Sequence, residues 1–335
     1  MTNSVLVAAV VVALVGIAAL VAAAREPLWG PVTATLDWCE SNYAVCLYIA
    51  EFWNTVTNLT MITLAVCGMV ATARAGAEFR FQLSNFGIML VGIGSWCFHG
   101  SLLYEMQLLD ELPMVYTTAV FIYCISLQDP KKRHSPALAL FLLVLCAAIT
   151  AVYVWWKEPL FHQVCYGLMV AYLTATCTRT AYRFRDDRAL VRVLVAAVFL
   201  FLAAWGLWNI DIHFCQELRE MREHMGPFAP LLELHAWWHV LTAYSSYLQV
   251  VFSTAVQLRV CGKGGTVGSM GFFGLTPCAV AGGAARAPVR RLPSKGEQDG
   301  AAPSPTATAP AAPKHAVGLN GHGVHARAGH RVDAQ

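Results

Sequence analysis

The stretch LHAWWHVLTAYSSYLQVVFSTAVQL, residues 234–258, decides the class of fold. It contains no Asp, Glu, Lys or Arg, and it is long enough to cross the hydrocarbon core of a bilayer as a helix. Its two histidines, His235 and His239, are four residues apart and therefore lie on one helix face, about one turn apart. Ionisable side chains at membrane depth are costly and usually mark a function. The stretch therefore predicts a membrane-spanning helix that carries a functional site.

The rest of the chain follows the same pattern. It is 57% hydrophobic and 13% charged, whereas a soluble domain has about 25% charged residues. Apolar runs predict seven spanning helices, at residues 45–73, 83–104, 112–128, 136–156, 159–181, 190–210 and 234–258. We therefore expect an all-α, polytopic membrane protein with a seven-transmembrane-helix bundle. Because the net charge is only +3 and its basic residues lie in short loops and the tail, nucleic acid is not an expected partner. No obligatory protein partner is indicated either.

Both ends of the chain differ from the central part. The apolar run 5–24 ends in small residues, as a signal peptide does, but no Lys or Arg precedes it. Residues 1–25 are therefore interpreted as a hydrophobic signal or anchor segment, and an uncleaved extra helix remains an alternative. Residues 26–260 form the predicted helical domain. Residues 261–335 are rich in Ala, Gly and Pro, and we expect a disordered tail there, because such a segment buries too little apolar surface to offset its ordering entropy.

Basic residues lie in alternate loops and so predict an orientation. They are Arg74 and Arg80, then Lys131, Lys132 and Arg133, then Arg183, Arg185, Arg188 and Arg192, and finally Arg259 and Lys263. The positive-inside rule then places the C-terminus in the cytosol and the segment 37–42 on the luminal side. Cys39 and Cys215 fall on this luminal side, where an oxidising compartment would permit a disulfide. The sequence leaves open whether they pair.

A third histidine, His99, lies in the apolar run 83–104. Three histidines are the ligand set of many catalytic zinc sites, in which a fourth position stays open for water. The alternative is that each histidine is a hydrogen-bonded core residue or a helix–helix contact. The spacing of His235 and His239, together with nearby acids, favours the metal.

Ser95 and Asp110 flank His99 and could complete a hydrolytic site. Ser95 lies four residues before His99, on the same helix face. Asp110 lies eleven residues after it, close to three turns if the helix is continuous, and a bend or a new helix starting at Pro113 would bring it nearer. Zinc lowers the pKa of its water, a carboxylate takes the proton, and a donor stabilises the oxyanion. The alternatives are a loop charge for Asp110 and a small residue at a helix crossing for Ser95.

A second group of oxygen ligands precedes the first helix. Asp37, Glu40 and Asn42 are close in sequence, and Glu51 follows within the helix. With the carbonyl of Trp38 they could supply most of a calcium shell. On spacing alone helix capping is favoured. Only the intramembrane placement of Glu51 indicates a metal.

Five segments carry a family resemblance: DWCESNYAVCLYIAEFWNTVTNLTMI (37–62), GSWCFHGSLLYEMQLLDELPMVY (94–116), EPLFHQVCYG (158–167), WNIDIHFCQELREMRE (208–223) and HAWWHVLTAYSSYL (235–248). In this order they resemble the alkaline ceramidases, and the phytoceramidase-type members in particular. The resemblance spans about residues 30–258 and leaves out both ends of the chain.

The resemblance implies a seven-helix membrane amidase of the endoplasmic reticulum or Golgi. It would cleave the N-acyl bond of phytoceramide, dihydroceramide or ceramide taken from the bilayer, giving a sphingoid base and a fatty acid, with stimulation by calcium. It also implies residue roles: zinc on His99, His235 and His239; catalysis by Asp110 and Ser95; calcium on Asp37, Trp38, Glu40, Asn42 and Glu51.

Two other classes of function remain open on the sequence. One is a seven-helix zinc-containing lipid receptor with low turnover. The other is a proton-coupled transporter whose buried acids and histidines relay protons. Sustained release of a sphingoid base would exclude the first, and bound zinc without proton-coupled flux would exclude the second.

Overall fold

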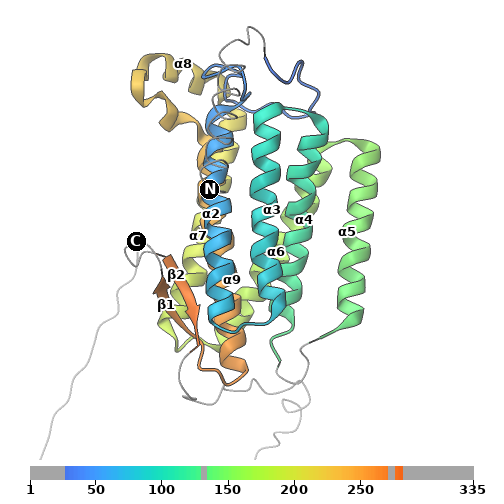
Figure 1. Cartoon of the computed structure of the whole chain (residues 1–335), viewed down its shortest axis with the longest axis vertical. Coiled ribbons are helices and arrows are strands. Elements are labelled where there is room, and N and C mark those ends of the chain that lie inside the picture. The colour runs from blue at the N-terminus through green and yellow to red at the C-terminus, as the bar shows by residue number, and fades with distance from the viewer. Residues whose placement is uncertain (1–26, 130–133, 271–275, 282–335) are drawn as a thin grey trace, which may run out of the picture. The chain divides into compact units, whose positions relative to one another are not determined.

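The computed structural model describes residues 27–129, 134–270 and 276–281. Within these residues it contains seven long helices: α2 (Phe52–Arg74), α3 (Phe79–Ser101), α4 (Tyr104–Ser126), α5 (Pro136–Trp156), α6 (Pro159–Arg183), α7 (Arg188–His213) and α9 (Leu234–Val260). Figure 1 shows them side by side. All but α9 have the length and apolar composition to cross a membrane. The predicted all-α, polytopic class of fold is therefore confirmed.

Helix α9 is the most enclosed of the seven and buries many polar side chains. It packs mainly on α7 and α2, and most of its length is buried. Its polar side chains accordingly find partners inside the bundle: Ser245 donates to the Ala197 carbonyl over 2.8 Å, and Gln249 donates to Ser253 over 3.1 Å. These polar side chains keep α9 out of the set of helices that are apolar enough to cross a membrane, although residues 234–258 contain no Asp, Glu, Lys or Arg.

The turn between α3 and α4 determines where Asp110 lies. Leu102 ends α3 in the left-handed region, with φ of 53°, and α4 begins two residues later. The alternatives of a continuous helix from His99 to Asp110, or of a new helix at Pro113, are both wrong, because Pro113 lies inside α4. Leu102 is completely buried, and its carbonyl accepts the N–H groups of Thr33 and Ala34, each over 3.1 Å. Asp110 therefore returns alongside α3 on a separate helix.

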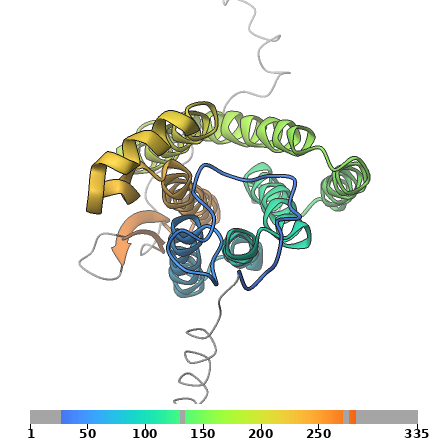
Figure 2. The same ribbon diagram turned by 90° about the horizontal axis from the view of Figure 1, so that it is seen from above.

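Residues 27–51 form an irregular segment that crosses the ends of α2, α3 and α4, as both ribbon views show (Figures 1 and 2). Backbone hydrogen bonds hold it on α3: Ala50 donates to the Gly100 carbonyl over 3.0 Å, and Glu51 donates to the His99 carbonyl over 2.9 Å. The segment is thus fixed directly on the residue that carries the first histidine.

Two pairs of elements were not predicted. A short helix, α8 (Cys215–Met225), continues into the 3-10 helix η1 (Gly226–Leu232), where only a loop was expected. Strands β1 (Thr266–Met270) and β2 (Thr276–Val280) pair antiparallel and pack against α9, α2 and α7. The Tyr247 hydroxyl donates to the Pro277 carbonyl over 2.8 Å.

The hairpin corrects the boundary of the expected tail, because ordered structure continues past residue 261. Five-residue strands are too short to give a clear alternating pattern in a Gly-rich sequence. Residues 1–25 and 282–335 of the predicted end segments lie outside the described residues.

Helices α3 and α4 approach closely at Gly94. A Cβ atom at this position would lie 2.0 Å from the Leu109 carbonyl oxygen and 2.6 Å from its carbon. No real contact is that short, so the absence of a side chain at Gly94 allows the two backbones to meet. Since Leu109 precedes Asp110, this contact also sets the distance from α3 to that carboxylate.

We predict that Gly94→Ala destabilises the protein by about 1–3 kcal/mol, since two backbones must separate to admit the methyl group. The matched control is Gly206→Ala in α7, where no atom lies within 4 Å of the added Cβ. That substitution should leave the melting temperature unchanged or raise it. Thermal unfolding in detergent compares the two, and equal melting curves would contradict the close approach.

Candidate metal centre

Three histidines from two helices meet in the interior. His99 comes from the last turn of α3, and His235 and His239 come from the first turns of α9. Each is at most 3% exposed, and one ligand atom from each lies within 4.8 Å of the others. The structure therefore brings together all three histidines that the sequence singled out.

The hydrogen bonds of these rings leave ligand atoms unused. His99 Nδ1 lies 2.5 Å from Glu51 Oε2, while His99 Nε2 has no hydrogen-bond partner among the described residues. His235 Nδ1 is likewise buried without a partner, and His239 Nδ1 lies 3.2 Å from Thr57 Oγ1. Buried polar atoms are rarely left unpaired. Three imidazoles with ligand atoms within 4.8 Å of one another, two of them with an unpaired nitrogen, fit a metal ion.

Asp110 and Ser95 lie at the same cluster. Asp110 Oδ2 is 4.0 Å from His99 Nε2, and the Asp110 carboxylate interacts with the Ser95 hydroxyl. Asn58 donates from its side chain to Ser95 Oγ over 3.0 Å. Since Asn58 donates to Ser95 Oγ and a carboxylate can only accept, the Ser95 hydroxyl donates its own proton to Asp110, and it could donate to a substrate oxygen once Asp110 is protonated. The geometry thus offers one acid–base group and one neutral donor beside the three imidazoles.

The predicted oxygen ligands form a second cluster above α2. Glu40 accepts the N–H groups of Trp53 and Asn54 over 2.7 and 2.8 Å, so it caps α2, as the capping alternative proposed. Asn42 donates to Asp37 over 3.1 Å, but the amide oxygen of Asn42 is buried without a partner. Glu51 makes no capping bond, and it accepts instead from Trp38 N over 3.0 Å. Capping therefore accounts for Glu40 and not for Glu51.

The cluster brings several carboxylates close together in a largely buried place. Burial, assisted by the nearby Glu51, raises the pKa of Glu40 to about 7. Asp37 and Glu51 also interact with each other. Three carboxylates and an unpaired amide oxygen in one place fit a hard cation that prefers oxygen ligands. The trace of residues 27–51 is what brings these groups together.

Glu51 connects the two clusters. Its Oε1 accepts from the backbone of Trp38, and its Oε2 contacts His99 Nδ1. A carboxylate on the second nitrogen of a metal-ligating histidine fixes its tautomer and orientation. Glu51 is therefore placed both to serve the oxygen cluster and to orient His99.

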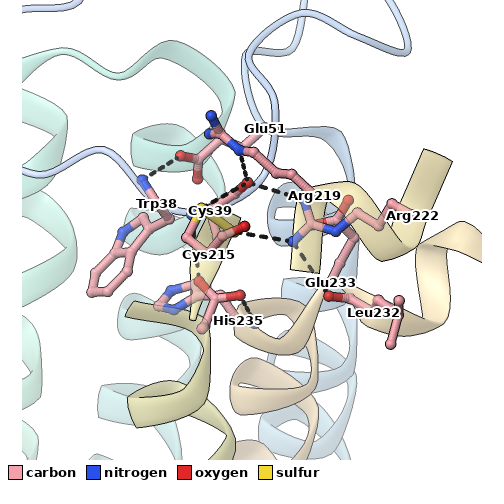
Figure 3. Close-up of a disulfide and its surroundings, with 10 residues drawn as sticks. Trp38, Cys39, Glu51, Cys215, Arg219, Arg222, Leu232, Glu233 and His235 are labelled. Carbon is pink, nitrogen blue, oxygen red and sulfur yellow. Dashed lines mark hydrogen bonds and ion pairs between the residues drawn. A yellow bond between two sulfur atoms is a disulfide. The ribbon is translucent and has the colours of Figure 1, made fainter. Parts of the chain in front are cut away.

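A disulfide joins Cys39 to Cys215, with 5.3 Å between their Cα atoms. Figure 3 shows it beside Arg219 and Arg222 of α8, which donate to the Cys39 carbonyl, each over 3.0 Å. Arg222 also pairs with Glu233 over 3.1 Å. Through these contacts α8 holds the 37–40 segment over the start of α9.

This attachment positions Trp38 on the histidine cluster. The Trp38 ring stacks on His235, with ring centroids 3.9 Å apart and planes 20° apart. Asp211 accepts the N–H groups of both Cys39 and His235, over 3.4 and 3.3 Å. Sequence reasoning did not single out Asp211 or Arg222. The available signal was an acid at the end of an apolar run, followed four residues later by Cys215.

A cavity of about 1360 Å³ opens beside the histidines. Ser95, Asp110, His235 and His239 line its polar part, and apolar residues of α6 and α7 line much of the remainder. Several of these lining side chains are more than half exposed: Leu160, Val164, Tyr182, Leu202 and Trp205. The cavity therefore presents accessible apolar surface on α6 and α7. It exceeds the range of about 300–1,000 Å³ that is usual for sites of small ligands.

Comparisons with known proteins agree on one family. The family model described as Ceramidase matches residues 30–271. The chain is 44% identical to alkaline ceramidase 3 of Mus musculus over 232 residues, which is 68% of this chain and 86% of that protein. It is 36% identical to alkaline ceramidase YPC1 of Saccharomyces cerevisiae over 242 residues, 67% of this chain and 77% of that one. An alkaline ceramidase of Arabidopsis thaliana is 32% identical over 227 residues, 67% of this chain and 84% of the relative.

Proposed function

The chain belongs to the alkaline ceramidase family, and from this premise we propose that it hydrolyses the N-acyl amide bond of ceramides to a sphingoid base and a free fatty acid. One observation carries the proposal: His99, His235 and His239 meet beside Asp110 at the polar end of an apolar cavity. A lipid amide needs both parts, a hydrolytic centre and an apolar enclosure for its chains.

We infer that the three histidines hold zinc. Imidazole nitrogens suit zinc, and three protein ligands leave a position for water. Bound zinc would lower the pKa of that water and polarise the amide carbonyl. The carboxylate of Glu51, at 2.5 Å from His99 Nδ1, would keep His99 in the tautomer that presents Nε2 to the ion.

The protein's own groups then move the protons. Asp110 accepts a proton from the attacking water and later gives it to the leaving amine, because an amine leaves only after protonation. The Ser95 hydroxyl donates to the amide oxygen as negative charge develops there. Asn58 fixes Ser95 in place through its 3.0 Å hydrogen bond. Asp110 thus serves as base and acid in turn, and Ser95 as a fixed donor.

Ceramide would enter from the bilayer. The exposed apolar side chains that line the cavity on α6 and α7 give the lipid chains an apolar route to the histidines. The amide then lies at the polar end of the cavity, between Asp110 and the start of α9. This route needs no protein partner.

We further propose that the oxygen cluster of Asp37, the Trp38 carbonyl, Glu40, Asn42 and Glu51 binds calcium. The excess of carboxylates and the unpaired amide oxygen of Asn42 support a hard cation. Since Glu51 also contacts His99, a cation there would stabilise the orientation of a zinc ligand. Calcium would on this account stimulate the enzyme without taking part in the reaction.

For the location, we propose the membrane of the endoplasmic reticulum or Golgi, with the metal centre at the luminal ends of the helices and the C-terminus in the cytosol. The disulfide supports an oxidising compartment on the side of α8. Basic residues such as Arg74, Arg188 and Arg259 lie at the opposite ends of their helices, as the positive-inside rule requires.

The function is tested by product release from purified protein. Wild-type enzyme should release sphingoid base from a ceramide panel, and removal of zinc by a chelator should abolish this release. His99→Ala, His235→Ala and His239→Ala should each lose both activity and bound zinc, whereas the exposed His134→Ala should lose neither. Full turnover with full zinc content in any one of the three would show that the ligand assignment is wrong.

The substitution Asp110→Asn tests whether Asp110 acts as a general base or as a ligand of the metal. The amide has nearly the same shape but cannot accept a proton, so the rate of the chemical step should fall by roughly 10² or more while zinc stays bound. Ser95→Ala should cost less, because zinc shares the charge on the amide oxygen. Single-turnover rates and metal analysis on the same preparations decide. Loss of zinc in Asp110→Asn would make Asp110 a ligand, and normal turnover would remove it from the mechanism.

The calcium site makes a separate prediction. Asp37→Asn should weaken calcium binding and lower activity or melting temperature at limiting calcium, while zinc content remains unchanged. Glu217→Gln removes an exposed acid of α8 outside the cluster and serves as the control. Calcium titrations of melting temperature and turnover measure the effect. If calcium changes neither the melting temperature nor the turnover of the wild-type protein, the calcium site is excluded.

A further inference from the structure

A second polar pair lies in the same cavity and takes no part in the mechanism above. Glu111 follows Asp110 in α4, and His162 lies in the first turn of α6. Both line the cavity, and they are 6% and 2% exposed. An ionisable pair is costly to bury among membrane helices, so such a pair usually marks a function.

The hydrogen bonds of His162 determine which of its nitrogens carries a proton. Its Nε2 lies 2.9 Å from the backbone oxygen of Glu111, and a carbonyl oxygen can only accept. Nε2 is therefore the donor, and Nδ1 of the neutral ring is an acceptor. Nδ1 is buried without a hydrogen-bond partner among the described residues. An imidazolium would need an acceptor within hydrogen-bond reach of Nδ1, and the nearest carboxylate oxygen, Glu111 Oε1, is 3.6 Å away.

The carboxylate of Glu111 is held from its other side. Its Oε2 accepts from the Tyr153 hydroxyl and from the Gln107 amide, the latter over 3.0 Å. The Gln107 amide donates to Thr35 Oγ1 and accepts from the Thr35 N–H, each over 2.8 Å. These bonds to the segment 27–51 fix the orientation of the amide. Two donors on Oε2 leave Oε1 as an acceptor that no described side chain satisfies. Glu111 Oε1 and His162 Nδ1 are thus neighbouring acceptors with no donor between them.

We propose that Glu111 and His162 form a subsite that binds a hydroxyl group of the sphingoid base. This inference rests on the proposed ceramide hydrolysis and specifies how that substrate is recognised. A hydroxyl supplies the missing donor, and its oxygen needs no further partner of a particular type. In a ceramide, the carbon that bears the amide nitrogen is flanked by two carbons that carry hydroxyl groups.

The position of the pair supports this assignment. Asp110, Glu111 and His162 line the same cavity and the two carboxyl groups interact electrostatically, so the subsite lies near the group proposed to protonate the amide nitrogen. A hydroxyl one carbon from the amide-bearing carbon would therefore reach it while the amide lies at Asp110. The His162 ring is also fixed, since it lies parallel to the Tyr166 ring, with centroids 6.3 Å apart and planes 5° apart. A rigid pair of acceptors near the reacting bond would position the bound lipid and select for a substrate that carries a hydroxyl group there.

The test compares substrates as well as variants. Dihydroceramide is compared with its 1-deoxy and 3-deoxy analogues, each lacking one of the two flanking hydroxyls. In the wild type, kcat/KM should fall by about tenfold or more for at least one analogue, since loss of the donating hydroxyl leaves a buried acceptor unpaired. In His162→Phe, which removes the acceptor, and in Glu111→Gln, whose amide can donate to His162 Nδ1, this difference between substrates should shrink to about twofold.

The controls separate recognition from folding. His134→Phe makes the same replacement at an exposed position and should keep the wild-type discrimination. Melting temperature and zinc content show whether each variant is folded, and Glu111→Gln, which keeps the side-chain shape, carries the test if His162→Phe does not fold. A general loss of stability would lower the rates for all substrates alike, whereas loss of the subsite changes their ratio.

Two outcomes would overturn the inference: equal rates of the wild type on all three substrates, or an unchanged penalty in both variants. Failure of the wild type to hydrolyse any ceramide would instead refute the proposed function. In that event the same ratios would be measured as binding constants of the three lipids, and equal binding of all three would refute the subsite as well.

Discussion

The contact between Glu51 and His99 is the constraint on which the remainder of the site depends. Glu51 is completely buried at the start of α2, and His99 is 1% exposed at the end of α3. A carboxylate placed there without partners would be very costly. The structure supplies partners from three directions: the Trp38 N–H, the Asn54 side chain and the His99 ring. Satisfying this one group orders the segment above the bundle and fixes the first histidine.

The need to satisfy Glu51 also explains why the segment 37–40 makes so many contacts with the helices below it. Trp38 can donate to Glu51 and stack on His235 only if residues 37–40 are held in one path. The Cys39–Cys215 disulfide and Arg222 hold that path from the side of α8 (Figure 3). Asp211 of α7 adds a hydrogen bond from the Cys39 N–H. Residues far apart in the sequence therefore line one cavity. Its lining is apolar on α6 and α7, and Ser95, Asp110, His235 and His239 form its polar part.

The buried acids of this cavity divide into two kinds. The Asp110 carboxylate lies 4.0 Å from the unpaired Nε2 of His99, beside the position proposed for the metal and its water. Glu111 instead accepts hydrogen bonds from Tyr153 and Gln107 on Oε2. These bonds hold its carboxylate in one orientation. The different roles proposed for these two carboxylates on α4 thus rest on the different side chains around them. Environment commonly assigns separate tasks to neighbouring carboxylates in this way.

The sequence by itself determined the class of fold, because a spanning helix needs about 20 apolar residues and such runs are visible without any structure. It also identified His99, His235 and His239, since ionisable residues stand out in apolar runs, and the spacing of His235 and His239 assigns them to one helix face. Only the tertiary structure decided how Asp110 reaches them, because the turn at Leu102 depends on long-range bonds to Thr33 and Ala34. The pairing of Cys39 with Cys215, the roles of Asp211 and Arg222, and the facing acceptors of Glu111 and His162 were likewise decided there. These depend on contacts between residues far apart in the chain, and local periodicity carries no information about such contacts.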